Sequence, residues 1–300
     1  MVYLLTYFNN PFNMLLSVLI FIFTTFFSSC TSASGDLPEI KPSPITKLDD
    51  KVLETSGLIY FDSAFWTIND SGNPNLLYKI DPQTGVVLTE IKIANAENID
   101  WEELTQDANY FYIADIGDNL RKRDEKQIYR IKKSDILKLK SGGSLDADVI
   151  RFEFPETDGK KVRLNAEAMV FYNGALHIFT KDFFETVHYS LPAQPGKAKV
   201  TYIEKYKSNG QVTGAAINEA NDKIILVGYL GMGDRLFWEL KNFSGNEFFN
   251  STTRTFSLGR VDETSQLEAV CYGPKQEIFL SNENTWNVKQ QLWSLSYPTE

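Results

Sequence analysis

Five copies of one strand pattern run through most of this chain, and this repetition constrains the fold more than any other feature. Each copy opens with a pair of small or acidic residues, and the openings begin 46, 65, 46 and 55 residues apart. The openings are Ser56-Gly57-Leu58, Glu102-Glu103-Leu104, Glu167-Ala168-Met169, Thr213-Gly214-Ala215 and Glu268-Ala269-Val270. Several strands in each unit of about 40–50 residues are typical of β-propeller blades.

Further apolar segments follow each opening and complete the expected blade. Second strands are expected at 65–68, 111–114, 176–179, 224–227 and 278–281. Third strands are expected at 77–80, 128–131, 187–191, 236–240 and 292–295. Fourth strands are expected in four of the five units, at 86–93, 149–154, 199–206 and 253–258. The last unit therefore lacks a fourth strand of its own.

The N-terminal segment around Pro44 to Leu48 is expected to supply that missing strand, which closes the ring and removes an exposed edge. The predicted fold is thus an all-β propeller of five blades with four strands each, closed by the N-terminal strand. Six blades are possible if the long second repeat hides a degenerate unit, although residues 134–139 there resemble a short helical insertion. A β-sandwich with incidental similarity between its strands is the alternative.

The first 35 residues contain no charged side chain and no histidine, and residues 15–27 are almost unbroken apolar sequence. That run is too short to span a bilayer comfortably, since a span takes about 20 residues, but it fits a secretory signal. Small residues directly before Cys30 resemble the lipobox of bacterial lipoproteins. We therefore predict a signal peptide at 1–29, a lipid-anchored tether at 30–43 and the propeller at 44–300.

The basic residues that usually begin such a signal are missing, so an ordinary cleaved signal, or an uncleaved anchor with an incidental cysteine, stays open. The lipoprotein reading predicts a bacterial cell-envelope protein on the periplasmic or surface face of the outer membrane. Its partners would be the bilayer, through an acyl chain on Cys30, and an unknown small ligand or protein. A net charge of −9 disfavours nucleic acid as a partner, and a monomer is expected.

Residues at equivalent positions of the first strands should meet near the propeller axis. These are Ser56, Glu102, Glu167, Thr213 and Glu268. Close carboxylates raise one another's pKa unless a cation compensates, and Ca²⁺ takes oxygen ligands. The predicted Ca²⁺ ligands are Glu102, Glu167, Glu268, Asn69, Asp115 and Asn282. The alternative is a water-filled channel in which Lys181 or Arg163 balances the charge.

Residues 115–123 form the most distinctive segment of the chain. Its Asp, Gly and Asn residues, including Asp118 and Asn119, resemble a calcium loop, but the glutamate that completes an EF-hand loop is missing. A tight turn in which Asp118 and Asn119 bond their own backbone is the simpler interpretation.

No familiar catalytic set is visible elsewhere in the sequence. His177 and His188 lack an obvious serine or cysteine partner, and Cys271 sits in an apolar run typical of a buried thiol. The catalytic residues therefore stay unassigned. If the chain is an enzyme, paired carboxylates or a metal-bound water must do the chemistry.

Some of these segments resemble known proteins. Asp100-Trp101-Glu102-Glu103-Leu104 with residues 112–119 and 128–131, and residues 165–169 with 179–182, resemble a family of uncharacterised bacterial exported propeller lipoproteins. The likeness spans about residues 50–200 and implies a fold but no activity. The repeats are more distantly similar to SdiA-regulated and esterase-like phytase propellers, and to calcium-dependent lactonases related to senescence marker protein-30. That likeness implies a cation in the central channel.

No active-site motif of these relatives matches residue by residue, so no catalytic role carries over. The predicted function is a cell-envelope lipoprotein whose propeller binds a small ligand or serves as a scaffold for a protein partner. The alternative is a calcium-dependent hydrolase of an ester, lactone or phosphoester.

Overall fold

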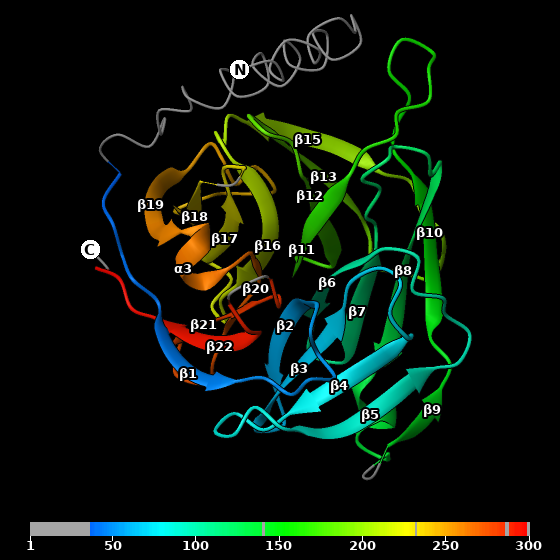
Figure 1. The fold of residues 1–300 in the computed structure, drawn as a ribbon. Helices are drawn as coiled ribbons and strands as arrows, with labels where there is room; N and C mark the ends of the chain where they lie inside the picture. Colours follow the sequence, from blue (N-terminus) through cyan, green and yellow to red (C-terminus); the bar gives the residue numbers. More distant parts are fainter. Residues whose placement is uncertain (1–36, 140–141, 232, 286–287, 299–300) are drawn as a thin grey trace, which may run out of the picture. The chain divides into compact units, whose positions relative to one another are not determined.

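The chain folds into five β-sheets arranged as blades around one axis (Figure 1). The computed structural model describes residues 37–139, 142–231, 233–285 and 288–298. Each innermost strand contacts the innermost strands of the two neighbouring blades, so the ring is closed. The predicted all-β, five-bladed propeller is confirmed.

The strands of each blade follow in sequence from the axis outward. The innermost strands are β2 (Thr55–Phe61), β6 (Trp101–Gln106), β11 (Ala166–Tyr172), β16 (Gln211–Ile217) and β20 (Leu267–Tyr272). The second strands are β3 (Ala64–Asn69), β7 (Tyr110–Asp115), β12 (Ala175–Thr180), β17 (Lys223–Tyr229) and β21 (Ile278–Asn282). The third strands are β4 (Leu76–Ile80), β8 (Glu125–Lys132), β13 (Thr186–Pro192), β18 (Asp234–Lys241) and β22 (Gln291–Leu295). The outermost strands are β5 (Val87–Ile93), β10 (Asp148–Glu153), β15 (Thr201–Tyr206), β19 (Thr252–Arg260) and β1 (Ser43–Lys47).

Two-residue turns join innermost to second strands where the sequence allows a left-handed backbone. Asn173 and Gly174 have φ of 49° and 80°, and Asp62 and Ser63 have φ of 50° and 57°. Turns with two positive φ values match the twist of a β-hairpin, and Asn-Gly is the preferred pair for them. These turns fix the register of the hairpins that carry the axial residues.

The two ends of the described chain meet in the fifth blade. β1 pairs antiparallel with β22, with Ser43 opposite Ser294 and Lys47 opposite Gln291. In Figure 1 the blue β1 lies directly beside the red β22. Pro44 is tolerated because β1 is an edge strand, and the backbone groups on its outer side pair with no neighbouring strand among the described residues. The predicted closure by the N-terminal strand is confirmed.

The long second repeat does not contain a sixth blade. Its insertion forms α2 (Lys133–Ile136) and β9 (Gly143–Leu145), and β9 pairs in parallel with β5 of the first blade. In the same way β14 (Gly196–Lys197) pairs with β10 of the second blade. A second short helix, α3 (Val261–Thr264), joins the fourth blade to the fifth. The insertion therefore covers a sheet edge, which would otherwise invite pairing with another chain.

Residues at the N-terminal end of the described chain lie along β19 of the fourth blade. Glu39 bridges Ser257, and the Ile40 amide donates to the Ser257 carbonyl at 2.9 Å. The described end of the predicted tether is thus paired to the propeller. The predicted signal peptide at 1–29 and lipidation site at Cys30 lie outside the described residues. Among the residues that the structure describes, no helix has the length and apolar character needed to cross a membrane.

Five apolar clusters hold the blades together, each between two adjacent blades. Trp66 and Trp101 pack between the first and second blades, and Phe179 and Trp238 between the third and fourth. Burying one large apolar side chain contributes roughly 1.5–3 kcal/mol. The side-chain packing thus lies between the sheets and leaves the axis to polar residues from the innermost strands.

Candidate functional site at the propeller axis

Each innermost strand carries one extra residue at the same place in its pairing with the second strand. The residues skipped by the pairing are Gly57, Glu102, Glu167, Thr213 and Glu268. Such β-bulges kink a strand and redirect its side chains. Our alignment of Ser56 with the three glutamates was therefore one residue out of register, because Gly57 holds the equivalent position.

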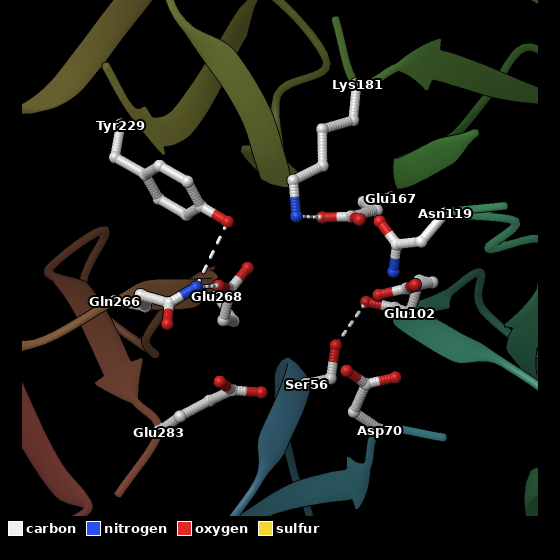
Figure 2. Close-up of a pocket in the computed structure, with 10 residues that line it drawn as sticks. All are labelled: Ser56, Asp70, Glu102, Asn119, Glu167, Lys181, Tyr229, Gln266, Glu268 and Glu283. Carbon is white, nitrogen blue, oxygen red and sulfur yellow. Dashed lines mark hydrogen bonds and ion pairs between the residues drawn. The ribbon is translucent and has the colours of Figure 1, made fainter. Parts of the chain in front are cut away.

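The three bulge glutamates converge on a cavity of about 270 Å³ at one end of the axis. Figure 2 shows their side chains pointing into this cavity from three different blades. We call it the axial cavity. Its walls are formed by Ser56, Asp70, Glu102, Asn119, Glu167, Lys181, Tyr229, Gln266, Glu268 and Glu283. The structure thus brings the predicted residues Ser56, Asn119 and Lys181 to the same place as the glutamates.

One ammonium group faces five carboxyl groups across this cavity. Lys181 Nζ lies 2.5 Å from Glu167 Oε2 and 5.3 Å from the centre of the Tyr229 ring. Burial alone would lower the pKa of Lys181, but Glu167 and Glu268 raise it above its usual range. Lys181 therefore stays cationic, and it compensates Glu167 more directly than any other carboxyl group of the cavity.

The wall formed by the fourth and fifth blades carries groups that can exchange protons. Gln266 Nε2 donates to the Tyr229 hydroxyl and to Glu268 Oε1, both at 3.1 Å. Burial, together with Asp70, raises the pKa of Glu283 to about 8. Glu283 can therefore gain or lose a proton close to neutral pH.

A tighter group of carboxylates lies where the first blade meets the second. Oxygens of Asp70, Asp100 and Glu102 lie within 4.8 Å of one another. Glu102 Oε1 is buried and has no hydrogen-bond partner within the described part of the chain. A Cβ at Gly117 would stand only 2.2 Å from that oxygen, so the glycine lets the backbone pass close behind it.

Burial is the main reason why these carboxyl groups are hard to ionise. It raises the pKa of Glu102 well above its usual range, with Glu167 and Asp70 adding to the effect. It also raises the pKa of Asp70 to about 6. Buried like charges are costly unless a cation compensates them, so Asp70, Asp100 and Glu102 form a candidate cation site.

Three of the predicted ligands have other partners and do not line the axial cavity. Asn69 Nδ2 donates to the Lys51 carbonyl at 2.8 Å, and Asn282 Oδ1 accepts from Trp293 Nε1 at 2.7 Å. Asp115 Oδ1 lies 2.8 Å from Arg123 Nη1 and accepts the Asp100 amide at 3.1 Å. Asp115 thus holds the backbone of Asp100 in place from behind. Thr213 does not line the cavity either, and its hydroxyl donates to the Leu267 carbonyl at 2.8 Å.

The predicted ligand set contains neither Asp70 nor Asp100. Tyr229 and Glu283 lie at the ends of second strands, as the repeat pattern indicates, but neither they nor Gln266 are among the predicted site residues. Asp70 follows directly after β3 and Asp100 directly precedes β6. Their position at the ends of β3 and β6 is the available signal, but the sequence does not show which of several neighbouring acids turn inward.

The segment at 115–123 forms a turn at the rim of the cavity. The Asp118 carboxylate accepts the amides of Lys122 and Arg123 at 2.7 and 2.8 Å and pairs with the buried Lys126 at 3.0 Å. Asn119 Oδ1 accepts from Asn165 Nδ2, which also donates to Glu167 Oε1, each at 3.0 Å. Asp118 therefore bonds its own backbone, as the turn interpretation predicts, while Asn119 links the rim to Glu167.

Glu103 closes the axis beneath the axial cavity. Its side chain is fully buried; Oε1 accepts the Leu104 amide at 3.0 Å and Oε2 accepts the Ala215 amide of the fourth blade at 2.9 Å. Burial raises the pKa of Glu103, and the amides of Ala215, Leu104 and Met169 oppose that rise. Gly57 also lets adjacent strands approach closely, since a Cβ there would lie 2.2 Å from the Leu104 nitrogen.

The histidines and the described cysteine lie away from the axial cavity. His177 Nδ1 and His188 Nε2 are 2.8 Å apart, and His188 Nδ1 is 3.2 Å from Glu204. Both rings are buried, and Phe248 packs against each of them. Burial raises the pKa of Cys271 well above its usual range, so the thiol is unreactive at neutral pH.

Comparison with known proteins bears on the fold alone. No family model matches the chain, and no curated protein matches it. Glutaminyl cyclase from Myxococcus xanthus is 10% identical, with a TM-score of 0.52 over 87% of this chain and 100% of that chain.

Two other solved structures are similar at lower scores. The PQQ-bound aldose sugar dehydrogenase from Streptomyces coelicolor is 10% identical, with a TM-score of 0.47 over 86% of this chain and 99% of that chain. A gluconolactonase from Xanthomonas campestris is 11% identical, with a TM-score of 0.46 over 88% of this chain and 85% of that chain. At 10% identity the likeness to the glutaminyl cyclase concerns the fold alone, and function must be argued from the site.

Proposed function

We propose that the axial cavity binds a divalent cation, preferably Ca²⁺, and uses it to hydrolyse a small polar ester, lactone or phosphoester. The observation that carries the proposal is the convergence of Asp70, Asp100 and Glu102 with a buried, unpartnered oxygen on Glu102. A buried carboxylate oxygen without a donor is costly, and a cation at this point would remove that cost.

The spacing of the oxygens supports a large, hard cation. Two oxygens that bind the same Ca²⁺ at about 2.3–2.6 Å can lie no more than about 5 Å apart. The carboxylate oxygens of Asp70, Asp100 and Glu102 all lie within 4.8 Å of one another. Mg²⁺ binds at about 2.0–2.1 Å and demands near-octahedral geometry, so it tolerates a narrower range of oxygen positions than Ca²⁺ does.

The remaining wall suits hydrolysis of a small molecule. A bound cation polarises a carbonyl or phosphoryl oxygen and lowers the pKa of water. Glu283, with a pKa of about 8, would take a proton from the attacking water as that water bonds to the acyl carbon or phosphorus. The leaving oxygen would depart with this proton. Lys181 would stabilise negative charge that develops on the substrate.

The proposal also places the protein in the bacterial cell envelope, held to the membrane through Cys30. It favours the hydrolase over a role as binding module or scaffold because of the groups that face the cation site. Glu283, Glu268 and Lys181 all have raised pKa values and line the same cavity of about 270 Å³. Perturbed titratable groups in a cleft mark functional sites.

Calorimetric titration of the metal-free protein with CaCl₂ tests the cation site. We expect saturable binding to the wild type and at least a hundredfold weaker binding to Glu102→Gln. Glu283→Gln is the matched variant, because it removes an acid from the opposite wall and should still bind Ca²⁺. No heat and no change in melting temperature with the wild type would contradict the cation site.

Turnover of p-nitrophenyl acetate, dihydrocoumarin and p-nitrophenyl phosphate tests the chemistry. We expect Ca²⁺-dependent hydrolysis of at least one of them, lost in both Glu102→Gln and Glu283→Gln. Ca²⁺ binding without turnover of any of the three would contradict the hydrolase and leave a cation-dependent binding module.

A further inference from the structure

A larger cavity of about 640 Å³ lies at the opposite end of the innermost strands. We call it the basal cavity. Its walls come from all five blades, at or just beyond the ends of β2, β6, β11, β16 and β20. They include Tyr60, Phe61, Gln106, Phe171, Ile217 and Tyr272. This volume falls within the range of small-molecule sites.

The interior of the propeller separates the basal cavity from the axial cavity. The carboxylates of the axial cavity lie near the first residues of the innermost strands, whereas Gln106, Phe171 and Tyr272 lie near their last residues. Glu103 and Gly57 pack against the neighbouring strand backbones between these levels. A ligand in one cavity would therefore not contact a ligand in the other.

Aromatic rings form much of the basal wall, and other rings support them from behind. Phe171 stacks on the buried Tyr112, with ring centres 5.8 Å apart and planes at 10°. Tyr60 and Phe61 are each held edge-on by a buried phenylalanine at 5.3 Å. All three lining rings are only half-buried, so part of each faces the cavity in a fixed orientation.

The charged groups of the basal wall already have partners, in contrast to those of the axial cavity. Lys133 Nζ donates to the Asp107 carbonyl at 2.5 Å and lies 4.7 Å from the centre of the Phe61 ring. The Asp107 carboxylate accepts the amides of Asn109 and Tyr110 and the Tyr112 hydroxyl. Glu219 also lines the cavity, but it is exposed to solvent. The interior thus offers little net charge to a ligand.

The groups of the basal wall that can still form hydrogen bonds with a ligand are side-chain amides and hydroxyls. Gln106 Nε2 donates to the Tyr60 carbonyl at 3.0 Å, which fixes the side chain and leaves its oxygen as an acceptor. Gln276 adds an exposed amide at the rim. Rigid aromatic faces beside oriented amides suit a molecule with apolar C–H faces and a periphery of hydroxyl groups.

We propose that the basal cavity is a second binding site, and that it takes an uncharged saccharide of about two rings. The C–H faces of the sugar rings would pack on Phe171, Tyr60 and Phe61, and Gln106 would accept a hydrogen bond from a sugar hydroxyl. The site would bind without a cation, because the Asp107 carboxylate already accepts three hydrogen bonds and Glu219 is exposed to solvent. It is therefore independent of the function proposed for the axial cavity.

Saturation-transfer NMR and calorimetry with maltose and N,N′-diacetylchitobiose test the site, using the full-length mature protein in EDTA. We expect at least one of these disaccharides to bind, and Phe171→Leu to weaken that binding at least tenfold. Glu102→Gln is the control, since it alters only the axial cavity and should leave the affinity within twofold. Thermal unfolding of Phe171→Leu shows whether the variant is folded, and the exposed Gln276→Ala provides a milder second variant.

Three outcomes would overturn the proposal. Neither disaccharide binding the wild type at 10 mM would exclude the saccharide class. Binding that is unchanged in folded Phe171→Leu and in Gln276→Ala would place the sugar elsewhere on the protein. Binding lost in Glu102→Gln would move the sugar to the axial cavity and make it a candidate substrate there.

Discussion

Glu102 and Glu103 are neighbours on β6, yet they occupy opposite kinds of environment. Both side chains are buried, and burial raises the pKa of both. Glu103 receives backbone amides from its own strand and from the fourth blade. Glu102 lies among other acids, and its Oε1 has no donor within the described residues.

The bulge on β6 creates this difference. Glu102 is the residue skipped in the pairing of β6 with β7, and Glu103 pairs normally opposite Ala114. The bulge turns one carboxyl group toward the axial cavity and leaves the next to bond across the axis. We infer that Glu103 stabilises the fold, whereas Glu102 is retained at a cost to stability for the sake of a ligand.

The largest expected effect comes from Glu103→Ala. This change leaves the amides of Leu104 and Ala215 without their acceptor and opens a space at the axis. Each unpaired buried amide costs about 1–3 kcal/mol, so we expect a loss of roughly 3–5 kcal/mol in the free energy of unfolding. Urea denaturation followed by tryptophan fluorescence measures it.

Glu103→Gln is the matched control for shape. It preserves the volume but sets an NH₂ group among backbone donors, so it should still destabilise the protein by about 1–3 kcal/mol. A Glu103→Ala variant as stable as the wild type would show that the two glutamates do not differ in the way we infer.

The second-largest effect is expected for Glu102→Gln, which should not lower the stability of the metal-free protein. Glu102→Gln removes a buried acid that lies near Glu167 and Asp70, so the apo variant should be as stable as the wild type or more so. With Ca²⁺ at a hundred times its dissociation constant, the wild type should gain about 2.7 kcal/mol, and the variant should gain almost nothing. Melting temperatures with EDTA and with CaCl₂ measure both quantities. Equal Ca²⁺ stabilisation of the two proteins would remove Glu102 from the ligands.

The sequence predicted the architecture well because strand period and repeat length are local properties. The five repeats, the three glutamates and the closing segment at 44–48 could all be found by comparing one repeat with the next. The individual ligands could not, because a single extra residue in a strand changes which side chains face the axis. Asn69 and Asp115 resemble ligands in the sequence. In the structure the Asn69 side chain donates to the Lys51 carbonyl, and the Asp115 carboxylate pairs with Arg123.

A smaller effect concerns pH. Glu283 has a pKa of about 8, above its usual value of 4.5, chiefly through burial. Between these values the folded chain holds a proton that the unfolded chain has released, so stability falls as pH rises through that window. Metal-free protein should therefore melt at a lower temperature at pH 8.5 than at pH 7, a range in which the histidines are neutral. Lys133, whose pKa burial lowers to about 8, opposes part of this fall.

Glu283→Gln should flatten this slope, because it removes the titrating group while keeping its shape. Glu268, whose pKa is also raised by burial, should leave a residual slope in that variant. A variant with the full wild-type slope would show that Glu283 does not titrate between pH 7 and pH 8.5.

The smallest effect tests whether the position of Glu102 depends on its backbone. The Ser56 hydroxyl donates to the Glu102 carbonyl at 2.6 Å, which ties the bulge to the first blade. Ser56→Ala should cost about 1 kcal/mol of stability and weaken Ca²⁺ binding only a few fold, because the Glu102 carboxylate remains. Urea denaturation and calorimetry of the same preparation measure both. If Ser56→Ala instead abolished Ca²⁺ binding with no loss of stability, the Ser56 hydroxyl itself would be a ligand. The contrast between a structural and a functional carboxyl group would then depend on the neighbouring strand as much as on the bulge.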